Sequence, residues 1–252
     1  MVEILILSLI QGVTEFLPIS SSSHLIIIAH YINFTNQNLS IDVSLHIGSF
    51  LAVLVFFKEE ILSFFKNTDL FLKILISSIP TILVGLVLVK TELIDKLRNI
   101  EIIGWTTIIF GILLYYSDKF KLDKTLDINY TYKSALIIGL LQILSLVPGV
   151  SRSGITITAA RLLNFKRYDS AKISFLLSIP TLAAVSIYGI INIFSSQNLG
   201  FSYINFFSVV FSFVISFLTI KYFLEYIKKF NLNIFVFYRV LLGVLILGFS
   251  YL

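Results

Sequence analysis

The chain has 252 residues, of which 57% are hydrophobic and only 13% are charged, and its mean hydropathy is +0.95. A soluble globular domain of this length does not reach such values, so the composition excludes that class and indicates a polytopic membrane protein. Cysteine is absent, which excludes disulfides and cysteine metal sites, and the net charge of +5 indicates cytoplasmic loops rich in Lys and Arg rather than a nucleic-acid partner.

Six apolar segments are long enough to cross a bilayer. About 30 Å of hydrocarbon requires roughly 20 helical residues at a rise of about 1.5 Å each. We expect spans at about 42–57, 71–89, 102–117, 172–195, 203–224 and 234–252. The N-terminal segment has neither a basic n-region nor a small-residue cleavage site, so we expect Met1 to start the mature chain.

Two further apolar segments, 1–32 and 133–163, are interrupted in the middle by proline and small polar residues. Pro18 and the pair Pro148-Gly149 should stop a helix. Residues 2–16 would form only about 22 Å of helix, which is too short to cross comfortably. We therefore predict two re-entrant helix–break–helix hairpins. Irregular backbone survives at membrane depth only where protein or water surrounds it, so both breaks are candidate sites.

The order of elements predicts an internal repeat. One hairpin and three spans are followed by a second hairpin and three spans, and "SSIPT" at 77–81 is echoed by "LSIPT" at 177–181. An odd number of spans in each half inverts the second half relative to the first. The predicted fold is therefore an all-α integral membrane protein, a single domain over 1–252 with inverted repeats at about 1–117 and 133–252.

The basic residues predict the orientation. If Met1 lies on one side, that side receives Lys90, Lys96 and Arg98. The other side receives fourteen basic residues: Lys58, Lys66, Lys73, Lys119, Lys121, Lys124, Lys133, Arg161, Lys166, Arg167, Lys172, Lys221, Lys228 and Lys229. By the positive-inside rule the richer side is cytoplasmic and both termini face outward. The first hairpin then enters from outside and the second from the cytoplasm, so their tips can meet near the midplane.

Glu15 and Arg152 are charged residues beside the two breaks. Each costs about 2.5–3.5 kcal/mol at the bilayer centre unless it is paired or faces water. They are expected to face each other across a polar cavity, and the alternative is a structural ion pair that pins the two halves. Gln11 and Glu15 are four residues apart and share a helix face, where they could also serve only helix–helix hydrogen bonding.

The serines that follow Pro18 supply hydroxyls and backbone N–H groups at the start of a helix, which is a ready anion site. They are Ser20, Ser21, Ser22 and Ser23, and for Ser22 and Ser23 simple capping is an equal alternative. His24 could relay a proton, although a lone membrane histidine is often a packing residue. Asp42 and His46 are also four apart, at a membrane edge, where the pair could be a local interaction.

The second break reads "VPGVSRSG", residues 147–154, and has the chemistry of a phosphate cradle. Gly149 and Gly154 allow close approach of backbone to a ligand, and Ser151 and Ser153 flank the guanidinium of Arg152. It is not a Walker A loop, because it lacks the lysine and the preceding strand. Arg239 is a third intramembrane charge that could pair with Glu225, snorkel or join the site, and the sequence does not separate these.

A carboxylate, a histidine, serine hydroxyls and an arginine together suit phosphoryl transfer on a phosphate attached to a lipid. A transporter for an anionic substrate would share the inverted repeat and the broken helices, and a structural scaffold would need the charges only for folding. The glutamate and histidine beside the serines favour an enzyme, because substrate coordination alone does not need them.

The motifs resemble a known family. "QGVTEFLPISSSSHL" at 11–25 and "PGVSRSG" at 148–154 resemble the two signatures of the undecaprenyl-diphosphate phosphatase family of the bacitracin-resistance type. "HIGSFLAV" at 46–53 and "FYR" at 237–239 are also similar to that family, so the resemblance covers essentially the whole chain. It implies a membrane hydrolase that removes the terminal phosphate of undecaprenyl diphosphate and so recycles the carrier for peptidoglycan synthesis.

The resemblance also implies roles for individual residues. Glu15, Ser21, His24 and Arg152 would be catalytic. The resemblance also places Gln11, Ser151 and Ser153 in the substrate pocket, and the residue chemistry described above adds Ser20, Ser22, Gly149 and Gly154 as substrate-binding candidates. Gln11 stands where many members have glutamate, and an amide is a weaker metal ligand and no general base, so Glu15 would do the acid–base or metal work alone. Serine, histidine and water all remain candidates for the nucleophile.

The same resemblance implies a divalent cation, Mg²⁺ or Ca²⁺, with Glu15 as its ligand. The expected partners are the polyprenyl diphosphate substrate and membrane lipid, and a homodimer is left open. The expected location is the bacterial plasma membrane, with the active site open to the outer face.

Overall fold

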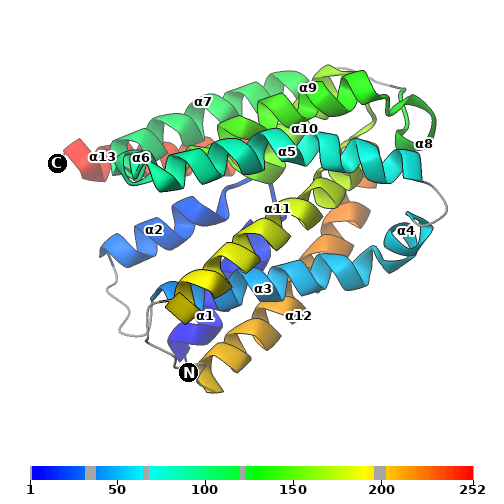
Figure 1. Cartoon of the computed structure of the whole chain (residues 1–252). Coiled ribbons are helices and arrows are strands. Elements are labelled where there is room, and N and C mark those ends of the chain that lie inside the picture. The colour runs from blue at the N-terminus through cyan, green and yellow to red at the C-terminus, as the bar shows by residue number, and fades with distance from the viewer. Residues whose placement is uncertain (1, 32–37, 65–67, 120–122, 196–202, 252) are drawn as a thin grey trace.

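The computed structural model describes residues 2–31, 38–64, 68–119, 123–195 and 203–251, and the described chain is a bundle of helices (Figure 1). Met1, Lys66 and Lys121, which entered the predictions on the start of the chain and on its orientation, lie outside the described residues, as does the last residue of the predicted final span. No strand is found within the described ranges, which confirms the all-α class.

Six of the helices are long and apolar enough to cross a membrane, which confirms the predicted spans and a multi-pass membrane protein. They are α3 (Leu39–Phe56), α5 (Thr68–Lys90), α7 (Ile100–Asp118), α11 (Arg167–Ser195), α12 (Tyr203–Lys229) and α13 (Asn233–Tyr251). Short helices α4 (Lys58–Ser63), α6 (Leu93–Lys96) and α8 (Leu126–Asn129) lie in the connections. Figure 1 places α4 and α8 at one end of the bundle and α6 with both chain ends towards the other.

The two interrupted segments are helix–break–helix elements, as predicted. The first consists of α1 (Val2–Thr14) and α2 (Ser21–Tyr31). The second consists of α9 (Tyr132–Gln142), a 3₁₀ turn η1 (Ile143–Leu146) and α10 (Arg152–Leu162). Whether these elements re-enter the same face of a bilayer stays a prediction.

Both breaks end on a serine with a left-handed backbone. Ser20 has φ 73° and Ser151 has φ 71°, and the next residue in each case begins a helix. Non-glycine residues seldom adopt positive φ, and they keep it where the surrounding structure over-determines it. The two breaks therefore have similar local geometry although their sequences differ.

Small residues allow the broken segments to pack closely on the spans. A Cβ at Gly12 in α1 would lie 2.8 Å from Ile215 in α12, and one at Gly139 in α9 would lie 2.4 Å from the carbonyl oxygen of Ser77 in α5. Close approach at small residues is typical of helix pairs in membranes, where dispersion contacts and not water exclusion drive association. The broken segments are consequently fixed against α12 and α5.

A line of hydrogen-bonded polar side chains joins α3 to α12. Asn205 donates to Ser40 Oγ at 2.6 Å and to Ser44 Oγ at 3.0 Å. Further along, Ser49 Oγ lies 3.2 Å from Ser212 Oγ and 3.0 Å from Ser216 Oγ. Because α3 also packs on α11, this seam connects α12 to the helices around the breaks.

A buried ion cluster closes the bundle at the end that carries α4 and α8. Asp118, at the C-terminus of α7, lies 2.7 Å from Arg167 Nε and 3.3 Å from Arg161 Nε, and it also accepts the backbone N–H of Leu232 at 3.0 Å. One carboxylate therefore holds the end of α10, the start of α11 and the α12–α13 connection. The sequence analysis assigned no role to Asp118.

The sequence echo does not support the internal repeat. "SSIPT" lies in α5, the second span of the first half, whereas "LSIPT" lies in α11, the first span of the second half. Pro80 and Pro180 both lie inside continuous helices. The helix pairs do favour the repeat. The first hairpin packs through α1 on α12, the second span of the second half, and the second hairpin packs through α9 on α5, the second span of the first half. The inverted repeat stays a prediction.

Candidate active site

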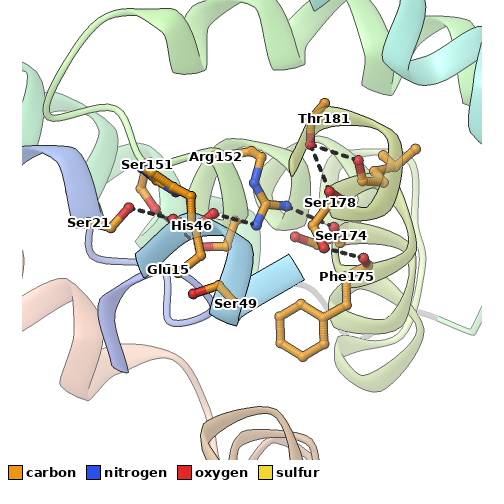
Figure 2. A network of polar contacts seen from close by, with 12 residues as sticks. Glu15, Ser21, His46, Ser49, Ser151, Arg152, Ser174, Phe175, Ser178 and Thr181 are labelled. Carbon is orange, nitrogen blue, oxygen red and sulfur yellow. Dashed lines mark hydrogen bonds and ion pairs between the residues drawn. The ribbon is translucent and has the colours of Figure 1, made fainter. Parts of the chain in front are cut away.

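The two breaks meet at a buried carboxylate. Glu15, the first residue after α1, is 7% exposed, and its Oε1 lies 3.0 Å from Arg152 Nη2 at the start of α10. Ser21, at the start of α2, donates its hydroxyl to Glu15 Oε2 at 2.6 Å. Figure 2 shows Arg152 on one side of Glu15 and Ser21 on the other. The structure thus brings together three of the four predicted catalytic residues.

Gln11 lies one helical turn before Glu15 and is fully buried. Its Nε2 donates to Glu15 Oε2 at 3.1 Å and lies 3.0 Å from Nδ1 of His46. The amide has two N–H groups, so it donates to both partners when Nδ1 carries no proton. Gln11 therefore links the carboxylate to α3. The sequence analysis gave His46 only a weak, local context.

Two of the three side-chain nitrogens of Arg152 are engaged in hydrogen bonds. Nη2 binds Glu15, and Nη1 donates to the carbonyl oxygen of Ser174 in α11 at 3.1 Å. Its Nε is buried and has no hydrogen-bond partner among the described residues. A buried N–H without a partner is costly, so this donor is suited to an anion that enters the site.

The serines of the second break connect the two breaks. Ser153 donates its hydroxyl to the carbonyl oxygen of Leu17 at 2.7 Å, which is a direct bond from α10 to the first break. Ser151 caps α10 by accepting the N–H of Gly154 at 3.1 Å, and its hydroxyl lies 3.2 Å from that of Ser153. Both predicted serines therefore lie where the two breaks meet, which we call the junction.

Gly149 is required by the backbone. Its φ is +95°, and a Cβ there would lie 1.9 Å from Thr106 Oγ1 in α7. Thr106 donates to the carbonyl oxygen of Pro148 at 2.6 Å, which fixes the second break against α7. The close approach at Gly149 is thus made by α7, a contact that the sequence did not predict.

His24 contacts the end of the first break, but its ring makes no hydrogen bond to Glu15 or Ser21 among those found in the described residues. Nδ1 lies 2.6 Å from the carbonyl oxygen of Ser20 and must therefore carry the proton, because a carbonyl only accepts. Nε2 then accepts the hydroxyl of Tyr238 in α13, also at 2.6 Å. Ser20 itself bonds to Ser23 at 2.9 Å and lies 3.3 Å from the hydroxyl of the exposed Ser22.

Arg239 joins the junction and does not snorkel. It is fully buried, and its guanidinium donates hydrogen bonds to backbone carbonyls from α7 and from both breaks, whereas Glu225 is exposed. Sequence reasoning had left its role open. Its signal was present, since an arginine in the middle of an apolar helix demands polar partners, but the partners could not be identified from the sequence.

The arrangement can perform phosphoryl transfer. A hydroxyl within 2.6 Å of a carboxylate can lose its proton as it attacks, and a guanidinium beside it can bind phosphate oxygens. Surrounding helices exclude bulk water, so these charges act at close quarters.

Comparison with known proteins points the same way. The chain matches the family model of the bacitracin resistance protein BacA over residues 4–245. It is 49% identical over 246 residues to an undecaprenyl-diphosphatase of Pelagibacter ubique (strain HTCC1062), a match that covers 97% of this chain and 96% of the relative. Relatives of the same name from Alteromonas mediterranea (strain DSM 17117 / CIP 110805 / LMG 28347 / Deep ecotype) and Jannaschia sp. (strain CCS1) are 40% and 34% identical. These two matches cover 99% and 98% of this chain, and 98% and 97% of the relatives.

Proposed function

The chain belongs to the bacitracin resistance protein BacA family, and from this membership and the geometry of the breaks we propose that it hydrolyses undecaprenyl diphosphate to undecaprenyl phosphate and inorganic phosphate. This reaction recycles the lipid carrier for peptidoglycan and other wall polymers. It also underlies the bacitracin resistance for which the family is named.

One contact carries the mechanism. The hydroxyl of Ser21 lies 2.6 Å from Glu15 Oε2, and Arg152 holds the other carboxylate oxygen at 3.0 Å. A nucleophile hydrogen-bonded to a base that is itself oriented by a third group is the arrangement of covalent catalysis. Among serine, histidine and water, this contact favours Ser21 as the nucleophile and Glu15 as its base.

In the first step, Ser21 Oγ attacks the terminal phosphorus while Glu15 accepts the hydroxyl proton. The new bond is Oγ–P, and the bond that breaks joins the terminal phosphorus to the bridging oxygen. Undecaprenyl phosphate leaves with that oxygen, which takes the proton from Glu15 and so returns Glu15 to its ionised form. In the second step, water attacks the phosphoserine, its proton passes to the leaving Ser21 oxygen by way of Glu15, and inorganic phosphate is released.

The second break supplies the phosphate contacts. Arg152 Nε has no partner among the described residues, so it can donate to a substrate oxygen without breaking an existing bond. Ser151, Ser153 and the backbone near Gly149 and Gly154 belong to the same break as Arg152 and are proposed to complete the cradle, with Ser20, Ser22 and Gln11 contributed by the first break and its helix. His24 is proposed to orient the Ser20 carbonyl, and direct proton transfer would require Tyr238 to release Nε2.

The donor set fits a divalent cation with few protein ligands. Within the described ranges, no group of three His, Cys, Asp or Glu side chains could hold a metal. Mg²⁺ is commonly bound by one or two carboxylates together with substrate phosphates. Glu15 would be the carboxylate ligand, and Gln11 Oε1, which is buried without a hydrogen-bond partner in the described chain, would be the second donor. When bound, the cation would neutralise charge on the diphosphate; Ca²⁺ fits the same oxygen donors.

The site is proposed to open to the outer face of the bacterial plasma membrane. The basic residues favour this orientation by the positive-inside rule, and the substrate is a membrane lipid. A homodimer also stays a proposal.

The mechanism is tested by trapping the covalent intermediate. Purified protein is mixed with substrate labelled with ³²P in the terminal phosphate, quenched in acid within one turnover and digested for mapping. We expect label on Ser21, and none in Ser21→Ala. The matched control is Ser8→Ala, because Ser8 is a buried serine of α1 whose hydroxyl has no partner in the described chain. Rapid hydrolysis by Ser21→Ala would instead favour direct attack by water.

A further inference from the structure

We propose that Arg239 is a positioning residue: its guanidinium binds the backbone carbonyls of both breaks at once and thereby sets the distance between the nucleophile side and the phosphate-binding side of the site. The residue touches neither Glu15 nor Arg152 through any hydrogen bond found among the described residues. It acts instead on the backbone from which these side chains project.

Four hydrogen bonds define this role, and all go to backbone oxygens. Nη1 donates to Pro18 at 3.2 Å, in the first break. Nη2 donates to Gly149 at 2.8 Å and to Val150 at 3.0 Å, in the second break. Nε donates to Thr107 in α7 at 3.2 Å. A single planar group thus reaches three segments that are far apart in the sequence.

Three of the four carbonyls that Arg239 binds, those of Pro18, Gly149 and Val150, lie in the breaks, outside the α-helices. A helix end leaves its last carbonyls unpaired, and hydrocarbon offers no water to satisfy them. Arginine presents five N–H donors in a fixed planar fork, so it can satisfy several acceptors in a set geometry, whereas lysine is a point charge on a flexible stem. The irregular backbone of both breaks therefore depends on the same side chain.

Neighbouring glycines show that the space is built around this guanidinium. A Cβ at Gly154 would lie 2.8 Å from Arg239 Nη1, and one at Gly111 in α7 would lie 3.1 Å from Arg239 Cβ. The sequence analysis assigned Gly154 to close approach of the substrate. In the structure, the absence of a side chain at Gly154 also makes room for Arg239.

The positions of Glu15 and Arg152 along the chain explain why the hydrogen bonds of Arg239 matter for catalysis. Glu15 lies three residues before Pro18, and Arg152 lies two residues after Val150. A shift of either backbone would move the carboxylate relative to the guanidinium, and misplacement of about 1 Å can cost about 100-fold in rate. Arg239 has four protein acceptors, so it is not poised to bind phosphate itself.

The kinetic consequence rests on the proposed function. We expect Arg239→Met to lower kcat per folded protein about 100-fold with KM little changed, and Arg239→Lys to recover part of that loss because it keeps the charge but not the fork. Gly154→Ala, which pushes on Nη1, should give a milder loss of the same kind. Arg161→Met is the matched control: it removes another buried arginine, in the Asp118 cluster, and should lower stability without lowering kcat per folded protein.

A second measurement needs no activity, because the natural chain has no cysteine. Leu17→Cys with Ser153→Cys places a pair across the two breaks, where Ser153 contacts Leu17, and Ser49→Cys with Ser216→Cys places a control pair across α3 and α12. Cross-linking with a short bifunctional thiol reagent is measured in membranes. We expect Arg239→Met to reduce cross-linking of the first pair and to leave the second unchanged.

The two measurements separate the two claims. An Arg239→Met protein that cross-links and turns over like its parent would overturn the positioning role while leaving the hydrolase intact. A loss of kcat that merely follows the loss of folded protein, with normal cross-linking, would also overturn it. A parent protein that releases no phosphate, but whose cross-linking of the first pair depends on Arg239, would contradict the proposed function and support the positioning role.

Discussion

At the scale of single residues, the site depends on how the oxygens of Glu15 are shared. Oε1 is held by Arg152, and Oε2 accepts from both Ser21 and Gln11. Each contact favours the ionised carboxylate, which is the form that can act as a base. The amide of Gln11 is compatible with this state, whereas a second carboxylate at 3.1 Å would repel it.

This reasoning predicts the effect of Gln11→Glu. The added carboxylate would be a second acidic ligand beside Glu15, so we expect the variant to need about tenfold less divalent cation for half-maximal activity. In the absence of a cation its activity should fall below that of the parent, since the two carboxylates repel. Titration of phosphate release against Mg²⁺ measures both effects. An unchanged titration curve would contradict a metal site at Glu15.

The sequence predicted those site residues whose chemistry is anomalous in an apolar segment. Glu15, Arg152 and the serines stand out because charge and repeated hydroxyls are expensive at membrane depth. His46 and Tyr238 could not be found in this way. Both lie in ordinary helical contexts, and only the three-dimensional contact with Gln11 or with His24 connects them to the site.

At the scale of elements, the close packing of α3 on α12 holds in place the helix that carries His46, which contacts Gln11 in the site. A Cβ at Gly48 would lie 2.5 Å from the carbonyl oxygen of Val209 and 2.7 Å from Ser212 Cβ, and the nearest of these atoms is backbone that cannot move aside easily. His46 and Ser49 lie on the same helix. Displacement of α3 would therefore move His46 away from Gln11.

We accordingly predict that Gly48→Ala lowers the free energy of unfolding by about 2 kcal/mol, because overpacking outweighs the better helix propensity of alanine. Gly248→Ala in α13 is the matched control, since a Cβ there meets nothing within 4 Å. Thermal unfolding of the two purified variants in one detergent measures the difference. Equal midpoints would show that the α3–α12 interface can adjust.

The Asp118 cluster makes a separate prediction about stability. Asp118→Asn leaves the buried Arg161 and the half-buried Arg167 without their carboxylate, and breaking a buried pair such as Asp118–Arg161 costs about 3–5 kcal/mol. We expect a large fall in the unfolding midpoint with normal kcat in the protein that remains folded, because Asp118 lies at the end of the bundle that carries α4 and α8. A selective loss of kcat without loss of stability would assign the cluster to catalysis.

Element boundaries were predictable where a simple rule applies. Hydropathy located the six spans, and Pro18 and Pro148 located the breaks, because both rules act locally along the chain. The positive φ of Ser20 and Ser151 was not predictable. Tertiary contacts impose this backbone conformation, and the identity of the residue as serine does not predict it.

At the scale of the whole molecule, the prediction that the two tips meet came from topology rather than from any motif. Opposite entry of two hairpins brings their tips together, and the bonds from Arg152 to Glu15 and from Ser153 to Leu17 join the two breaks. The pairing of α1 with α12 and of α9 with α5 favours the inverted repeat. The contacts that fix the breaks, made by Thr106 in α7 and Arg239 in α13, could not be read from the sequence, since they depend on how these helices pack.

Orientation can be tested with single cysteines, which the natural chain lacks. Thr91, beside α6, and Glu59, in α4, are exposed and lie at opposite ends of the bundle. We predict that a membrane-impermeant maleimide labels Thr91→Cys in intact cells, and labels Glu59→Cys only after the membrane is opened. The reverse pattern would place the first break on the cytoplasmic side and contradict an outward-facing site.

The most direct test of the whole account is phosphate release from undecaprenyl diphosphate by the purified protein, with and without a chelator, beside Glu15→Gln and Arg152→Met variants that purify as folded protein. We predict metal-dependent release by the parent and a loss of about 1,000-fold or more in each variant, because both remove a group placed at the reacting phosphate. Absence of release from well-folded parent protein, or full activity in Glu15→Gln, would contradict it.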